Sequence, residues 1–149
     1  LRPPLVYGAG APGNFAQMLR LLDLGAPLPL ANIKNKRDLL YVGNLVDAII
    51  TCATHPAAAN NTYLVSDGEA VSTPEILRRL AKELGVSSRL LPFPIGILKL
   101  VAAIFGRAGQ VNRLTSSLQV DSTKIRHQLG WMPPYSLQQG FCETIKGKK

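Results

Sequence analysis

The sequence predicts an α/β fold that is rich in helices and contains only a few short strands. Short apolar runs alternate along the chain with longer segments of helical periodicity, and Gly and Pro residues separate them. The 149 residues are 46% hydrophobic, which is enough to build a packed core. The strands are too few and too short for a complete doubly wound sheet, so we expect an incomplete α/β fold.

The chain should begin with a strand, a glycine-rich turn and a helix. Residues 5–7 are a short apolar run that leads into the turn-rich stretch 8–13. Asn14 is a candidate N-cap for a helix whose apolar residues recur at helical spacing until Gly25. Residues 26–31 alternate Pro and Leu, and proline cannot donate to a strand ladder, so this segment should be irregular or an edge strand.

The next segments should form a strand, a helix and a further strand. Residues 39–42 are apolar and precede a break at Gly43, after which Asn44 is a candidate N-cap. The helix over 45–54 should end at His55, because the following proline disfavours helical backbone there. A turn at two asparagines then leads into a strand over 62–65.

The rest of the chain should hold four helices and one strand-like segment. Capping residues mark the starts of the helices, and glycine marks most of their ends. The predicted elements are a helix capped by Ser72 and ended by Leu84-Gly85, a strand-like segment over 89–93, an apolar helix over 95–105 closed by Gly106, a short helix capped by Asp121 and ended by Gly130, and a last helix capped by Ser136 over 137–145. Trp131 should pack in the core.

The formal net charge of +8 would suit an anionic partner such as nucleic acid, an acidic membrane or a phosphorylated small molecule. Part of the excess lies in the run Lys34, Lys36, Arg37 and part in the tail Lys146, Lys148, Lys149. The other basic residues are spaced like solvated helix faces, which favours ordinary surface charge. Aromatic residues make up only 6% of the chain, so stacking on bases is poorly provided for and we expect no nucleic-acid partner.

Cysteine usage and hydropathy indicate a soluble, cytoplasmic protein with no membrane partner. Cys52 and Cys142 share no metal-ligand spacing with a histidine, so we expect buried thiols and no metal site. The longest apolar stretch, 95–105, contains Lys99 and falls short of the ~20 residues that span a bilayer. The chain begins at Leu1 and passes at once into a strand, which leads us to expect that a preceding part is missing.

Gly8, Gly10 and Gly13 spell G-x-G-x-x-G between a strand and a helix, the spacing that lets a backbone approach a dinucleotide pyrophosphate. Pro12 removes one N–H from such a cradle, and the acidic residue expected about 20 positions later is absent. The glycines therefore either bind a dinucleotide, serve another ligand, or merely turn the chain. The last two readings are favoured.

Five segments, in order, resemble the extended short-chain dehydrogenases of the NAD-dependent epimerase/dehydratase family, and together they cover essentially the whole chain. They are Leu1-Arg2-Pro3-Pro4-Leu5-Val6-Tyr7-Gly8-Ala9-Gly10 (R-P-x-x-V-Y-G-P-G), Arg37-Asp38-Leu39-Leu40-Tyr41-Val42 (R-D-Y-I-H-V), Asn44-Leu45-Val46-Asp47-Ala48 (D-L-A-x-A), Tyr63-Leu64-Val65-Ser66-Asp67-Gly68 (Y-N-V-G-x-G), and Asp121-Ser122-Thr123-Lys124-Ile125 with Leu129-Gly130-Trp131 (D-x-S-K-A…L-G-W). The resemblance implies the C-terminal, substrate-binding portion of a Rossmann-type nucleotide-sugar 4-epimerase or 4-keto reductase.

The resemblance also implies which parts this chain lacks. The family's catalytic pair is Y-x-x-x-K, but no tyrosine of this chain has a lysine four residues later. The NAD(P) loop of the family belongs further upstream as well. We therefore expect NAD or NADP in the intact enzyme, none bound by residues 1–149 alone, and no turnover by this chain. Pro3 should lie near the nicotinamide.

The resemblance implies a UDP-sugar as the substrate, changed at C4, and it assigns the binding residues. Arg37 and Arg113 would grip the diphosphate, because a guanidinium suits two phosphate oxygens. Asn14, with Phe15 beside it, would contact the same group, and the backbone at Leu28 and Leu30 would pair with uracil. Each assignment has a purely structural alternative. Arg37 could be a surface arginine, Asn14 a helix cap, and the segment of Leu28 and Leu30 a plain edge strand. The alternative function is a non-catalytic interaction module with a basic surface, and homo-oligomer formation stays open.

Overall fold

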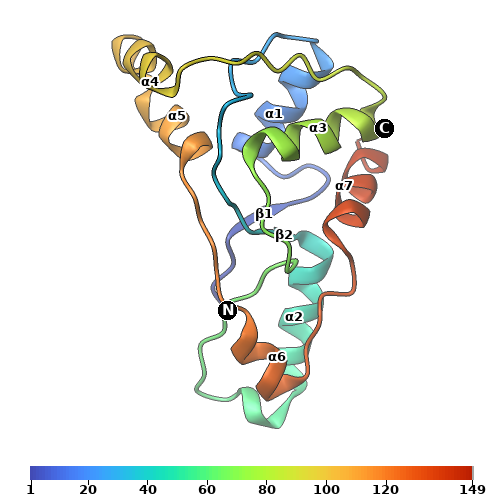
Figure 1. The fold of residues 1–149 in the computed structure, drawn as a ribbon. Coiled ribbons are helices and arrows are strands. Elements are labelled where there is room, and N and C mark those ends of the chain that lie inside the picture. The colour runs from blue at the N-terminus through green and yellow to red at the C-terminus, as the bar shows by residue number, and fades with distance from the viewer. Residues whose placement is uncertain (149) are drawn as a thin grey trace. The chain divides into compact units, whose positions relative to one another are not determined.

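The computed structural model describes residues 1–148 (Figure 1). Its elements are β1 (Leu5–Tyr7), α1 (Asn14–Asp23), β2 (Leu39–Tyr41), α2 (Val42–Thr54), the 3-10 turn η1 (Pro56–Ala58), α3 (Thr73–Leu84), α4 (Ile95–Ile104), α5 (Ala108–Thr115), α6 (Thr123–Leu129) and α7 (Leu137–Lys146). They form two compact units. The sheet unit comprises residues 1–11, 38–70 and those from 118 onwards, and the helical unit comprises 12–37 and 71–117. The fold is α/β and rich in helices, as predicted.

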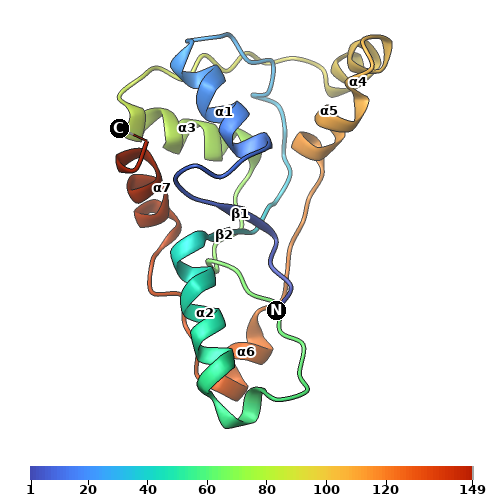
Figure 2. The ribbon, with the colours of Figure 1, turned by 180° about the vertical axis from the view of Figure 1, so that it is seen from behind.

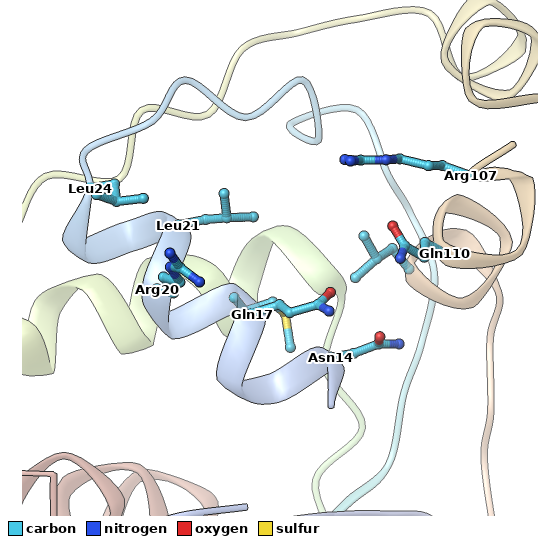
Figure 3. A pocket seen from close by; sticks show the side chains of 9 residues that line it. Asn14, Gln17, Arg20, Leu21, Leu24, Arg107 and Gln110 are labelled. Atoms are coloured by element: carbon cyan, nitrogen blue, oxygen red, sulfur yellow. The ribbon is translucent and has the colours of Figure 1, made fainter. Parts of the chain in front are cut away.

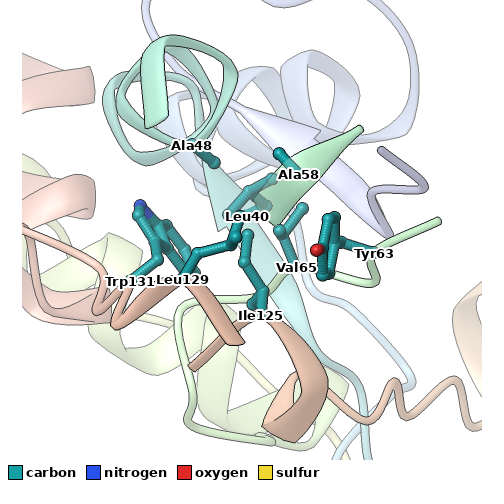
Figure 4. Packing of buried hydrophobic residues seen from close by; sticks show 8 residues of the cluster. All are labelled: Leu40, Ala48, Ala58, Tyr63, Val65, Ile125, Leu129 and Trp131. Atoms are coloured by element: carbon teal, nitrogen blue, oxygen red, sulfur yellow. The ribbon is translucent and has the colours of Figure 1, made fainter. Parts of the chain in front are cut away.

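The sheet unit is built on a parallel pair of strands, in which Leu5 of β1 lies opposite Leu39 of β2. β2 passes directly into α2, and α7 packs beside β2. The hydrophobic core combines side chains from β2, α2, η1, the segment before Asp67, α6 and the residues after it (Figure 4). Its members are Leu40, Ala48, Ala58, Tyr63, Val65, Ile125, Leu129 and Trp131. Trp131 is therefore a core residue, as predicted, and its Nε1 donates to Asp47 at 2.8 Å.

The helical unit is organised around the packing of α1 on α3, which lie side by side in both views (Figures 1 and 2). α1 buries Phe15, Met18, Leu19 and Leu22, which recur at helical spacing and form the stripe that the sequence predicted. α3 buries an equivalent stripe against it. A second pair in this unit is formed by α4 and α5.

Several predicted helix ends are confirmed. Each of them depends on hydrogen bonds between residues that are close together in the sequence. Ser72 caps α3, where its hydroxyl accepts a hydrogen bond from the backbone N–H of Glu75. Ser136 forms a complete capping box with Gln139 at the start of α7. Gly25 follows α1 with φ +62°, and the N–H groups of residues 25 and 26 return to the carbonyls of residues 22 and 21, which is a Schellman motif.

Three predicted N-caps are wrong by one to three residues. Gly13 takes the cap position of α1 with φ +90°, a conformation that glycine adopts easily, so Asn14 lies inside the helix. α2 starts at Val42 because β2 runs straight into it, so Asn44 lies in the first turn. Ser122 is the N-cap of α6, although the carboxylate of Asp121 accepts from the N–H of Thr123.

Two predicted strands are wrong. The segment 62–65 makes a single bridge, between Leu64 and Arg2, and the segment 89–93 makes one between Leu90 and Leu28. Each segment pairs with its partner at one residue only, and a single bridge does not make a strand. The two cysteines are half-buried and free, so the expectation of buried thiols is also wrong.

α5 was not predicted, because its apolar residues are few and Gly109 interrupts them. No helix within residues 1–148 has the length and apolar character that a membrane span requires. Of the basic tail, Lys149 lies outside the described residues.

Candidate functional site

A cavity of about 470 Å³ opens in the helical unit between α1 and α5 (Figure 3). Its lining comes from α1 and the residue after it, and from α5 and its N-terminal flank. The lining residues are Asn14, Gln17, Met18, Arg20, Leu21, Leu24, Arg107, Gln110 and Leu114. This volume falls in the range of small-molecule sites.

Helical spacing explains why these side chains gather. Arg107, Gln110 and Leu114 follow one another at steps of three and four, so they lie on the same side of α5. On α1, Gln17 and Leu21 have the same relation. The opposite side of α1 is buried against α3, which fixes the rotation of the helix and turns its polar side toward the cavity.

The chemistry of the lining suits an anion attached to an apolar or weakly polar body. Arg20 and Arg107 each carry a guanidinium, which can bind two oxyanion oxygens at once. Asn14, Gln17 and Gln110 add carboxamides, and Met18 with three leucines supplies apolar wall. None of the nine lining residues, all within the described chain, is acidic.

Asn35 fixes the position of α5, and with it one wall of the cavity. Its side chain is 5% exposed, and its Oδ1 accepts from the backbone N–H of Thr73 at 2.9 Å. Its Nδ2 donates to the Thr73 hydroxyl at 2.9 Å and to the Ser116 carbonyl at 2.9 Å. The Thr73 hydroxyl in turn donates to the Leu114 carbonyl at 2.6 Å. One buried carboxamide therefore links the start of α3 to the end of α5.

Arg37 also contacts α5. Its backbone pairs with Val71 in an antiparallel bridge, and its Nη1 donates to the carbonyl of Arg113. A cation near the C-terminal end of a helix is favourable to the helix dipole. Burial lowers the pKa of Arg37 through desolvation of the charged form, but an arginine stays protonated at neutral pH. Its Nε is buried and has no hydrogen-bond partner in the part of the chain that the structure describes.

The structure brings together some of the predicted binding residues. Asn14 lines the cavity, and Arg113 lies on α5 next to a lining residue, with its side chain exposed. Phe15 is 1% exposed, so its side chain packs in the core and offers almost no surface to a ligand. Pro3 is exposed and belongs to the sheet unit. The roles assigned to these residues stay predictions.

The expected open backbone edge at Leu28 and Leu30 is wrong. The N–H of Leu28 donates to the carbonyl of Arg89, and its carbonyl accepts from Leu91 and from the N–H of Leu30. The carbonyl of Leu30 accepts from Ile33. Both side chains are buried. These backbone groups are therefore already paired, and a base could reach them only by displacing the segment 89–91.

Of the lining residues, Asn14 alone was predicted from the sequence, and the four other polar ones were missed: Gln17, Arg20, Arg107 and Gln110. On both helices a long polar residue recurs three positions after another, which marks one polar side. This spacing of polar residues could have been recognised for α1, which was predicted as a helix. It could not be recognised for α5, because that helix was not predicted.

The sheet unit contains a buried polar cluster around Asp67. The carboxylate accepts from the Tyr7 hydroxyl at 2.8 Å, from Asn44 Nδ2 at 2.7 Å and from the N–H of Tyr41 at 3.0 Å. Burial raises the pKa of Asp67, and these hydrogen bonds oppose the rise. Burial also raises the pKa of Tyr7, with the nearby Asp67 charge acting in the same direction. The cluster satisfies its own donors and acceptors, so we interpret it as structural.

The glycine-rich loop folds as a turn, in which the N–H of Ala11 donates to the Gly8 carbonyl. The two strands described within residues 1–148 pair in parallel beside it. Among the described residues there is no cluster of three His, Cys, Asp or Glu side chains that could hold a metal ion.

Curated relatives share sequence along nearly the whole chain. The UDP-glucose 4-epimerase of Vibrio cholerae is 49% identical over 147 residues, which is 98% of this chain and 45% of that protein. The N-acetyl-alpha-D-glucosaminyl-diphospho-ditrans,octacis-undecaprenol 4-epimerase of Escherichia coli O157:H7 is 25% identical over 98% of this chain and 47% of its own length. The chain thus spans a little under half the length of these relatives.

Solved structures share the fold at lower identity. The UDP-N-acetylglucosamine 4-epimerase of Bacillus cereus superposes with a TM-score of 0.75 at 20% identity, over 99% of this chain and 46% of that one. The UDP-glucose 4-epimerase of Thermotoga maritima, solved with UDP-glucose, gives 0.70 at 23% identity over 98% and 44%. The sequence profile of the 3-beta hydroxysteroid dehydrogenase/isomerase family matches residues 1–95. The chain therefore belongs to this family of extended short-chain dehydrogenases, which confirms the resemblance to the NAD-dependent epimerases and dehydratases.

Proposed function

We propose that the natural protein uses NAD(P) to epimerise or reduce C4 of a UDP-linked sugar, and that residues 1–149 supply its substrate-binding portion. The observation that carries this proposal is the cavity between α1 and α5, with two arginines, three carboxamides and no acidic lining residue among those described. It occurs in a chain that is 49% identical to a UDP-glucose 4-epimerase. The two curated relatives named above share one substrate feature, a sugar attached to a diphosphate.

In this proposal the diphosphate lies between Arg20 and Arg107. Its two negative charges would face two guanidinium groups, and attraction between them is strengthened in a cavity from which water is partly excluded. Asn14, at the start of α1, adds a carboxamide. The first-turn N–H groups of a helix have no intrahelical partner, and they favour an anion at the same place.

The two remaining predicted diphosphate ligands take more limited roles. Arg37 commits Nη1 to the carbonyl of Arg113, so Nε, which is buried, and Nη2 are the guanidinium nitrogens that it could still offer. We propose that Arg37 acts first by holding the end of α5 and second by donating to the ligand. Arg113, whose side chain is exposed, would approach the ligand from outside the cavity.

In this proposal the chemical step uses groups that lie outside residues 1–149. Oxidation or reduction at C4 requires a proton donor or acceptor beside the C4 oxygen and a hydride carrier, and NAD(P) supplies the hydride exchange when bound. No tyrosine here has a lysine four residues later. We propose that the Y-x-x-x-K pair and the NAD(P) site lie in the half of the relatives' length that this chain does not span.

An activity assay on the natural full chain tests the proposal. With UDP-glucose and NAD or NADP, an epimerase should form the C4 epimer, which NMR distinguishes by the coupling constants of the sugar ring. A reductase should instead consume NAD(P)H with a 4-keto UDP-sugar. Residues 1–149 alone should give neither product. Full-length protein that leaves all these sugars unchanged would overturn the proposal, and turnover by the 149-residue piece would overturn the division of labour.

A further inference from the structure

α4 is apolar on the side that faces away from its partner helix as well as on the side that packs. Ile95, Leu98 and Ala102 follow one another at steps of three and four and are the more buried residues of the helix, consistent with packing on α5. The opposite side carries large apolar side chains in the open, with Ile104 73% and Phe105 75% exposed. This α4 apolar face comprises Ile97, Leu100, Val101, Ile104 and Phe105.

We propose, in place of the expectation that the protein has no membrane partner, that the α4 apolar face docks on the surface of a lipid bilayer that contains anionic lipids. Large exposed apolar patches on soluble proteins mark interaction sites. A helix of ten residues is about 15 Å long, too short to cross a bilayer, but a helix of this size can lie in the interface with its apolar side in the acyl boundary.

The charge around α4 decides between a bilayer and a neutral apolar partner. Between Glu83 and Asp121 the sequence contains no acidic residue, while it contains four basic ones. Those are Arg89, Lys99, Arg107 and Arg113. A helix that combines exposed large apolar side chains with exclusively basic charged residues in its own stretch of sequence matches the negative surface potential of anionic lipids.

A second apolar stripe is exposed on α2, so exposed hydrophobic surface alone does not distinguish α4. On α2, Val46, Ile49 and Ile50 are also at least half exposed. That stripe has the acidic residue Asp47 within it, and no lysine or arginine occurs between Leu39 and Asn61. The charge of Asp47 would be repelled by an anionic lipid surface. We therefore propose α4 as the docking helix and use α2 as the control.

Vesicle sedimentation with the natural full chain tests this inference. Vesicles of phosphatidylcholine with roughly 30 mol% phosphatidylglycerol should bind the protein at least about fivefold more tightly than vesicles of phosphatidylcholine alone. The double substitution Ile104→Ser and Phe105→Ser should weaken that binding at least about tenfold. Lys99→Gln should weaken binding to the anionic vesicles by about fivefold.

The control is the double substitution Val46→Ser and Ile50→Ser on α2, which should leave vesicle binding unchanged. All four substituted apolar positions are half exposed or more, so circular dichroism should show the same folded content for every variant. Absence of binding to anionic vesicles would overturn the inference, as would equal binding by the α4 variant. A soluble dimer that the α4 variant dissociates would overturn it as well, because a second copy of the chain would then cover the face.

Discussion

Replacing Asn35 with alanine should destabilise the helical unit and loosen the wall of the cavity that α5 forms. The substitution removes the acceptor of the Thr73 N–H and the donor to the carbonyls of Ser116 and Leu114. Thr73 is 1% exposed, so its N–H would remain buried without a partner. The Leu114 carbonyl keeps the hydrogen bond from the Thr73 hydroxyl at 2.6 Å.

The magnitude follows from which groups lose a partner. A buried, unsatisfied donor costs about 1–3 kcal/mol, and the carbonyl of the exposed Ser116 can turn to water at little cost. Loss of packing around a side chain that was 5% exposed adds to this. We therefore expect Asn35→Ala to lower the free energy of unfolding by about 2–3 kcal/mol, a change of roughly 30-fold to 160-fold in the unfolding equilibrium constant.

Urea unfolding followed by circular dichroism measures this change. Asn32→Ala is the matched control, because Asn32 is exposed and makes one long contact, at 3.5 Å, to the Phe93 carbonyl. It should change the free energy of unfolding by less than about 0.5 kcal/mol. Asn35→Asp should also destabilise at neutral pH, because a carboxylate faces the Leu114 and Ser116 carbonyls without a proton to donate. Equal stability of the Asn35 and Asn32 variants would refute the role given to Asn35.

Three further predictions concern the sheet unit. Burial raises the pKa of Asp67 above its ordinary value of 3.8, so protonation stabilises the folded chain. That contribution is complete below pH 3.8 and is lost as the pH rises through the raised pKa. The free energy of unfolding of the wild type, measured by urea titration relative to that of Asp67→Asn, should therefore increase as the pH is lowered. Gly140→Ala would place a methyl group against the Tyr7 hydroxyl and should lower the free energy of unfolding by about 3 kcal/mol, measured by thermal melts. Gly109→Ala in the helical unit is the control, because open space surrounds that position, and it should leave the stability unchanged or raise it. Trp131→Phe loses the indole hydrogen bond and should cost about 1–2 kcal/mol; an unchanged melting temperature would contradict its place in the core.

The parts of the fold that depend on nearby residues could be predicted from the sequence. A capping box such as that of Ser136 and Gln139 is complete within four residues, and the apolar stripe of α1 identifies its buried side. The predicted N-cap of α2 failed because a distant contact decides it. Asn44 uses its side chain to bind Asp67 and Tyr135, residues far along the chain, and not the first turn of its own helix.

The candidate site could be predicted only in part. Its α1 wall has a readable polar side, and Asn14 was singled out from the sequence alone. Its α5 wall depends on Asn35 joining two segments about 40 to 80 residues away, which no local pattern encodes. Arg107 could therefore be identified as a lining residue only from the structure, in which it lines the cavity together with residues of α1.

Calorimetric titration of the chain with UDP-glucose tests the central claim most directly. Arg20→Ala and Arg107→Ala should each weaken binding about tenfold or more, because each removes a charge-assisted contact to the diphosphate. Arg78→Ala, which removes an exposed arginine of α3 outside the cavity, should leave the affinity unchanged. UDP-glucose binding that is equally strong in all three variants would contradict the assignment of the cavity to the nucleotide sugar.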